Sequence, residues 1–268
     1  MDAKLFAARV AETLTTSEPD RDPDVVLRAV LELAVPGVDV AAIAAAAVPL
    51  GAPGMHRRGR VVYPQLGGLD PHVDPRRCSV MVVVEIAEGG GGDTPPASVV
   101  TRCLDIRLRR DDEAWRLESL GNVSDAAVAR PGTLTETAAR VLEHPRIALP
   151  DSVRWDIHEG VVDERVLSEL SRLADDVPLA ITTCRRGHPA NVFGTSRRSA
   201  HSAGRAVDVW RVGEPVVSQH TDPTSVAHEV AREIAAAGHV RNFGSPWSFP
   251  GGRSFTDPVH LDHLHLGF

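Results

Sequence analysis

The sequence has little lysine, few aromatic residues and few cysteines, and each scarcity excludes something. Lys4 is the only lysine among 29 basic residues, and the formal net charge is −7. The chain therefore lacks the basic surface that is typical of a general nucleic-acid binder. Aromatic residues make up 4% of the chain, so aliphatic side chains and alanine must fill any core. The three cysteines include no CxxC pair, which excludes a zinc ribbon.

Long hydrophobic runs are also missing. No stretch approaches the ~18 apolar residues that a membrane-spanning helix needs, so we expect no transmembrane segment. Residues 1–12 are amphipathic and lack the charged-then-apolar pattern of a signal peptide. Two locations stay open: the cytoplasm, or an extracytoplasmic, cell-wall-associated site if an export signal has been removed. The sequence predicts no oligomeric state.

Two of the cysteines, Cys78 and Cys103, lie on expected consecutive strands and are nearly symmetric about the loop that joins them. One hypothesis is that they face each other and form a disulfide in an oxidising compartment. The alternative is that both are small buried thiols. Cys184 is expected to pack as a small hydrophobic side chain.

The first half of the chain predicts an α+β module, with helices followed by an antiparallel meander. An apolar-periodic segment after Asp22-Pro23 has helical spacing. Four β-rich runs follow, separated by loops rich in Gly, Pro and Asp. We expect strands at 60–66, 79–87, 99–108 and 114–120. By fold analogy alone, residues 1–130 form a module of the cystatin or nuclear-transport-factor type, of unknown role.

The second half predicts a separate α+β domain with a small antiparallel sheet. We expect a linker helix within residues 131–150 and a second domain over residues 151–268. Asp163 and Ser225 are placed to cap two helices of that domain. Short strands are expected at 179–183, 206–210 and 264–268.

Two histidine-containing clusters of this second domain point to metal chemistry. In a C-terminal strand His263 and His265 share one face, while the intervening leucines face the core. Asp208 alternates with buried valines in the same way. If the two strands are neighbours, Asp208 meets a histidine across the ladder, and His201 reaches them through the turn at Gly204. Two imidazoles and a carboxylate make a three-ligand zinc site with one open position.

These residues resemble a known family. The pattern Ser-x-His-x-x-Gly-x-Ala-x-Asp from Ser199 to Asp208, followed far downstream by His-x-His, resembles the signature of the zinc D-Ala-D-Ala carboxypeptidase superfamily. That group also contains murein endopeptidases, phage endolysins and the hedgehog signalling domain. The resemblance covers roughly residues 150–268. It implies one zinc ion per chain, bound by His201, Asp208 and His265.

The same resemblance suggests further site residues. Arg186, at the end of an expected strand, would meet a substrate carboxylate or the polarised carbonyl, although Cys184-Arg185 replaces the family's Gly-Tyr. The general base stays open between Asp262 and His263. A regular strand through Asp262 would turn its side chain away from the zinc, so a kink would be needed. His260 is a supporting substrate-binding residue, and Ser199 orients the loop or contacts substrate. We interpret His188 as an ordinary polar residue.

The resemblance implies a zinc metallopeptidase that hydrolyses a peptide bond in bacterial cell-wall (peptidoglycan) peptides with a zinc-activated water. It does not separate carboxypeptidase from endopeptidase action. The alternative is a zinc-stabilised, non-catalytic binding module of the hedgehog type, in which the first half of the chain recognises a partner.

Overall fold

The computed structural model describes the chain as two compact units. The first unit comprises residues 1–126 and 186–196, and the second comprises residues 127–185 and 197–268. Both units combine helices with a sheet, which confirms the α+β class. The residues described are 2–18, 24–47, 50, 55–70, 74–90, 94–112, 114–122, 133–219 and 222–268.

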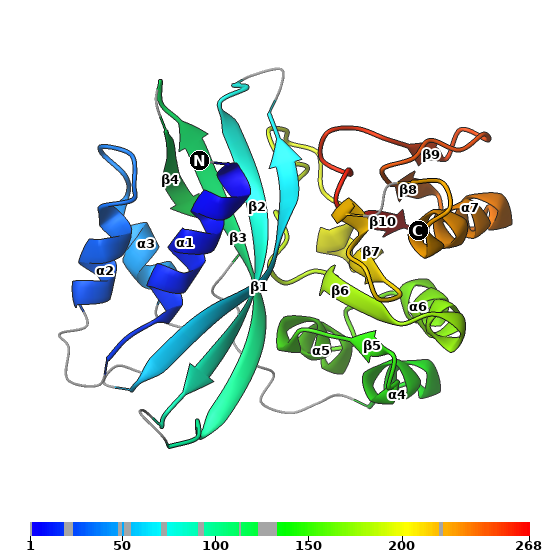
Figure 1. The fold of residues 1–268 in the computed structure, drawn as a ribbon, viewed down its shortest axis with the longest axis horizontal. Coiled ribbons are helices and arrows are strands. Elements are labelled where there is room, and N and C mark those ends of the chain that lie inside the picture. The colour runs from blue at the N-terminus through cyan, green and yellow to red at the C-terminus, as the bar shows by residue number, and fades with distance from the viewer. Residues whose placement is uncertain are drawn as a thin grey trace. The chain divides into compact units, whose positions relative to one another are not determined.

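The first unit is a four-stranded antiparallel meander with three helices on one side of it (Figure 1). The predicted order of helices followed by strands is confirmed. The helices are α1 (Ala3–Thr15), α2 (Asp24–Leu31) and α3 (Val40–Ala47). The strands, in both chain and sheet order, are β1 (Arg57–Leu69), β2 (Arg77–Glu88), β3 (Ser98–Arg110) and β4 (Trp115–Leu120).

The alternation of side chains along the strands determines which residues form the core of this unit. It also determines whether Cys78 and Cys103 can meet. Cys78 belongs to the set of alternate β2 residues that pack with α1 in the helix-covered core. In the β2–β3 register Cys103 pairs with Val83, five residues along from Cys78. Because five is odd, the two side chains point to opposite faces of the sheet. The disulfide hypothesis is therefore wrong: all three cysteines are buried thiols outside any disulfide.

The second unit packs its helices against a six-stranded sheet in one hydrophobic core. Its helices are α4 (Glu136–Glu143), α5 (Asp151–His158), α6 (Glu164–Asp176) and α7 (Val226–Ala237), with short 3-10 turns η2 (His201–Ala203) and η3 (Val217–Gln219). Its strands are β5 (Ile147–Ala148), β6 (Leu179–Thr183), β7 (Ala206–Val212), β8 (Asn242–Gly244), β9 (Ser254–Phe255) and β10 (Leu264–Gly267).

This sheet is larger and more mixed than the small antiparallel sheet that we expected. The strand order is β5-β6-β7-β10-β8-β9, and the two outer pairs, β5–β6 and β8–β9, are parallel. The central pairs are antiparallel. The chain therefore returns at its C-terminus to the middle of the sheet, where β10 lies between β7 and β8.

Caps and packing explain the helices of the second unit. The side chains of Asp163 and Ser225 accept backbone N–H groups at the starts of α6 and α7, as predicted. Gly238 ends α7 in the left-handed region, with φ 70°. Helix α4, within the expected linker, places Ala138 and Val141 in the core of the second unit.

Among the helices that the structure describes, none is both long enough and apolar enough to cross a membrane.

Candidate metal centre

The centre is built on the pairing of β7 with β10. In this antiparallel ladder His265 lies directly opposite Asp208, so the two strands are the neighbours that the alternation argument required. The leucines that flank His265 and the valines that flank Asp208 are all buried in the hydrophobic core. Because these leucines and valines are buried on one face of the strands, His265 and Asp208 must both point to the opposite face. There the imidazole Nδ1 of His265 lies 2.9 Å from Oδ1 of Asp208.

His201 reaches the same place through a tight turn. It begins the 3-10 turn η2, which Gly204 ends with φ 66°, and the N–H of Gly204 donates to the carbonyl oxygen of His201. A Cβ on Gly204 would overlap the carbonyl oxygen of Val161, so this position demands glycine for both its conformation and its space. The N–H of His201 donates to Oγ of Ser199 (3.2 Å), which explains the serine of the motif.

Three potential ligand atoms converge in this unit. Nε2 of His201 lies 3.2 Å from Nδ1 of His265 and 3.2 Å from Oδ1 of Asp208. Zinc held at 2.0–2.1 Å by a tetrahedral set would space its ligand atoms by about 3.4 Å, so these distances need only a small adjustment. The other imidazole nitrogen of His201, Nδ1, lies 2.8 Å from the carbonyl oxygen of Cys184. That contact fixes the ring orientation, as the outer partners of zinc-binding histidines do.

Beside these three side chains lie two histidine–carboxylate pairs. Nδ1 of His263 is 2.7 Å from Oδ1 of Asp262, and its Nε2 is 3.8 Å from Oδ1 of Asp208. β10 begins only at Leu264, so Asp262 lies in the preceding turn and is free of the strand alternation that would turn it away. Asp262 and His263 are both buried.

The second pair is His260 with Asp257, whose Nδ1 and Oδ1 atoms are 2.7 Å apart. The His260 ring centroid lies 5.1 Å from that of His263 and 5.5 Å from that of His265. Gly244 on β8 makes room for this ring, because a Cβ there would lie 2.5 Å from Cδ2 of His260. Thus His260 packs beside the centre, with its orientation set by Asp257.

Burial and charge set the protonation states of the centre. His201 and Asp208 are 1% exposed, and His265 is 8% exposed. Burial raises the pKa of Asp208, but the neighbouring His201 and His263 outweigh it and hold that pKa well below its usual value. Burial lowers the pKa of His265 to about 4. At neutral pH the centre therefore offers a carboxylate and an uncharged His265, the protonation states that bind metal.

The pKa of His265 predicts a pH dependence for the metal-free protein. The pKa is about 4 in the folded state and 6.5 for an unperturbed histidine, so the unfolded state binds more protons between these values. Stability should fall as pH drops from 7 to 5, by on the order of 1 kcal/mol per pH unit. Urea unfolding in a chelator should show this slope in the wild type and a flatter one in His265→Gln. Equal slopes would contradict the assignment.

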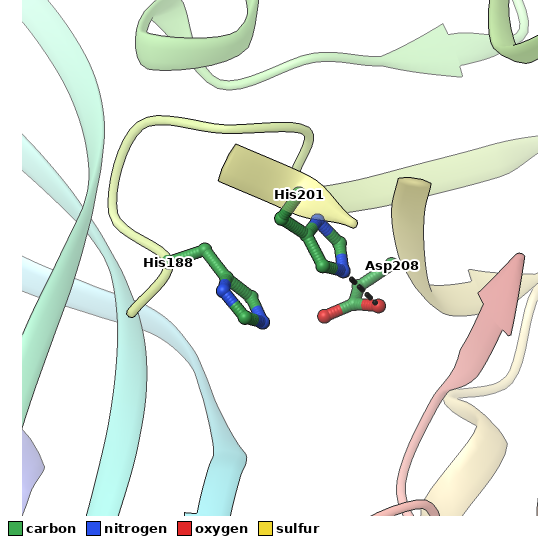
Figure 2. A group of neighbouring side chains, drawn as sticks. All are labelled: His188, His201 and Asp208. Carbon is green, nitrogen blue, oxygen red and sulfur yellow. Dashed lines mark ion pairs between the residues drawn. The ribbon is translucent and has the colours of Figure 1, made fainter. Parts of the chain in front are cut away.

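Figure 2 draws a second possible set of metal ligands, which shares His201 and Asp208 with the first set. Among the described residues, potential ligand atoms of His188, His201 and Asp208 lie within 4.8 Å of one another, close enough to hold one metal ion. The dashed line marks the ion pair of His201 with Asp208. His188 lies on the segment 186–196 of the first unit, whereas His201, Asp208 and His265 all belong to the second. The shorter distances of that latter set make it our choice of ligands.

Sequence reasoning missed His188, because no motif surrounds it and its only signal is its place between the β6 strand and His201. The predicted substrate residue Arg186 lies on the same segment and is 9% exposed. The described second unit thus brings together six predicted residues: His201, Asp208, Asp262, His263, His265 and, beside them, His260. Ser199 supports the turn that carries His201.

Comparison with known proteins finds no matching family model, no matching curated protein and no matching solved structure.

Proposed function

We propose that this protein is a zinc-dependent peptidase that hydrolyses a peptide bond in bacterial cell-wall peptides. One observation carries the proposal. Two imidazole nitrogens and one carboxylate oxygen, from three separate elements of the second unit, lie 2.9–3.2 Å apart in a buried site beside a histidine–carboxylate pair. A purely structural zinc site closes its fourth position with a further protein ligand, whereas a catalytic one keeps it for water.

His201, Asp208 and His265 would hold the ion through Nε2, Oδ1 and Nδ1. The donor set suits zinc, since imidazole and carboxylate are among its usual ligands. When bound, zinc supplies a water with a pKa near 7 and an electrophile for the scissile carbonyl. Asp208 is buried with three histidine rings within 3.8 Å of its Oδ1 atom, which keeps the carboxylate ionised and ready to bind.

His263 is the best-placed general base. A carboxylate accepts hydrogen bonds, so the 2.7 Å contact with Asp262 favours the tautomer with the proton on Nδ1. Nε2 then carries a lone pair on the side of Asp208, where it can take the proton of a water and pass it to the leaving amine. Asp262 orients the imidazole, as the carboxylate of a hydrolase triad does. This arrangement supports a role for each residue, with His263 as the general base and Asp262 as the group that orients it.

The substrate class rests on the resemblance of Ser199–Asp208 and His263–His265 to the zinc D-Ala-D-Ala carboxypeptidase superfamily. We therefore propose a peptide containing D-amino acids, with Arg186 and His260 as substrate contacts. A wall substrate implies an extracytoplasmic location.

The test is a cleavage assay on defined muropeptides, with zinc-loaded wild-type protein and product analysis by mass spectrometry. The probes are a peptide ending in D-Ala-D-Ala, its L-Ala-L-Ala counterpart, and a cross-linked dimer. We expect cleavage of a D-containing probe, loss of cleavage in a chelator, and recovery with zinc. Release of the terminal D-Ala identifies a carboxypeptidase, and opening of the dimer an endopeptidase. Zinc binding without cleavage of any probe would contradict the peptidase and favour the non-catalytic module.

A further inference from the structure

The chain makes an excursion just before the first proposed ligand of the metal centre. After β6 it leaves the second unit at Arg185, and it returns at Arg197, four residues before His201. The intervening segment, residues 186–196, groups with the sheet of the first unit. The chain before the segment contacts the chain after it inside the second unit, where the carbonyl oxygen of Cys184 lies 2.8 Å from Nδ1 of His201. In the chain, the segment therefore lies between His201 and the carbonyl group that contacts its ring.

The first anchor of the segment is Phe193. It lies against Gly68 of β1, where a Cβ would overlap the Phe193 side chain, so the contact is possible only because residue 68 is glycine. The Arg77 guanidinium lies 5.8 Å from the centre of the Phe193 ring. Arg77 is itself fixed by hydrogen bonds of 2.9 Å from Nε to the Glu118 carboxylate. The Phe193 ring is thus held by residues of two strands, Gly68 of β1 and Arg77 of β2, which together form its seat on the sheet.

The second anchor lies at the start of the segment. Gly187, with φ 81°, packs so closely on β3 that a Cβ would overlap the carbonyl oxygen of Cys103. The thiol of Cys103 donates to the carbonyl oxygen of Gly187 (3.6 Å), and Nδ2 of Asn122 donates to the carbonyl oxygen of His188 (3.2 Å). These contacts use the face of β3 opposite to the helix-covered core. The sequence left Cys103 open between a disulfide and a buried thiol, and in the structure its thiol makes this contact.

From these contacts we infer that the sheet of the first unit is a positioning element for the segment 186–196, which carries the proposed substrate residue Arg186. The sheet holds the segment, and with it Arg186, in one conformation. A free loop would lose conformational entropy each time substrate bound. A seated loop has lost that entropy on folding, and substrate binding is correspondingly tighter. The effect on activity rests on the proposed function, whereas the seating of the segment does not.

The test compares two neighbouring glycine variants. Gly68→Ala places a methyl group into the seat of Phe193. Gly67→Ala is the matched control, because the atoms nearest to its Cβ belong to the flexible Met81 and Ser79 side chains, at 2.9–3.0 Å, and not to the segment. The readouts are trypsin cleavage at Arg185, Arg186, Arg197 and Arg198, bound zinc, and kcat and KM on the cleaved muropeptide.

We expect Gly68→Ala to be cut by trypsin at these four arginines at least about tenfold faster than the control, because cleavage follows the open population. Zinc content should be unchanged, since all three proposed ligands lie in the second unit. The value of kcat/KM should fall about 10- to 100-fold, mainly through KM. Phe193→Ala should reproduce the effect, and Phe193→Tyr should retain most of the wild-type behaviour, which guards against a folding defect in Gly68→Ala.

Equal trypsin sensitivity in Gly68→Ala, Phe193→Ala and the control would overturn the seat. Faster cleavage with unchanged kcat/KM would overturn the positioning role. If the wild type hydrolyses no muropeptide, the proposed function fails, and the trypsin comparison still decides whether the sheet holds the segment.

Discussion

Replacement of His201 by alanine is expected to remove zinc from the protein and to abolish peptide hydrolysis. His201 supplies one of three proposed ligands, and its Nε2 lies 3.2 Å from the other two ligand atoms. The remaining pair, Asp208 and His265, cannot hold zinc with the affinity of a three-ligand site. Equilibrium dialysis should show loss of tight zinc binding, and turnover should fall to background. We expect the backbone to fold, because the ring lies at the centre and not among the packed valines and leucines.

The matched control is His239→Ala. This histidine belongs to the same unit, pairs with Glu169 (2.9 Å) and lies outside the cluster. It should keep full zinc binding and turnover. If His201→Ala binds zinc as tightly as His239→Ala does, the assignment of the centre is wrong.

The second large effect is expected at the pair Asp262 and His263. Neither is a proposed ligand, so Asp262→Ala and His263→Ala should each retain about one zinc. Each should lose turnover by a factor of about 100 to 10,000, the usual contribution of a general base. Metal content and kcat on the cleaved muropeptide are the measurements.

A variant with both Asp262→Ala and His263→Ala shows whether the two residues act together or independently. If Asp262 acts by orienting His263, removal of both should cost little more than removal of His263 alone, because residues that act as a unit are not additive. If Asp262 is itself the base, the two losses should multiply. Unchanged turnover in Asp262→Ala would leave His263 as the base without a required orienting partner.

Local periodicity allowed much of this centre to be predicted. The alternation of Asp208 with valines and of His265 with leucines has a period of two, which names the buried face of each strand without knowledge of the fold. The β7–β10 register then places the two side chains opposite each other. The glycine of the motif has a local cause as well, since the turn of His201 needs a left-handed residue at Gly204.

Features that depend on register and on distant packing were not predictable. The side chain of Cys103 faces away from Cys78 because the hairpin pairs it with Val83, and a shift of one residue would have reversed that result. The turn that frees Asp262 from the strand is visible only once β10 is known to begin at Leu264. The seat of Phe193 joins residues more than a hundred positions apart, at Gly68, and leaves no periodic signal.

The most direct test of the central claim is metal content by elemental mass spectrometry, on wild-type protein purified with neither added zinc nor chelator. The account predicts about one zinc per chain, in line with a single buried set of His201, Asp208 and His265. A wild-type protein that contains no metal, and that takes up none when zinc is offered back, would contradict the zinc centre and with it the proposed peptidase.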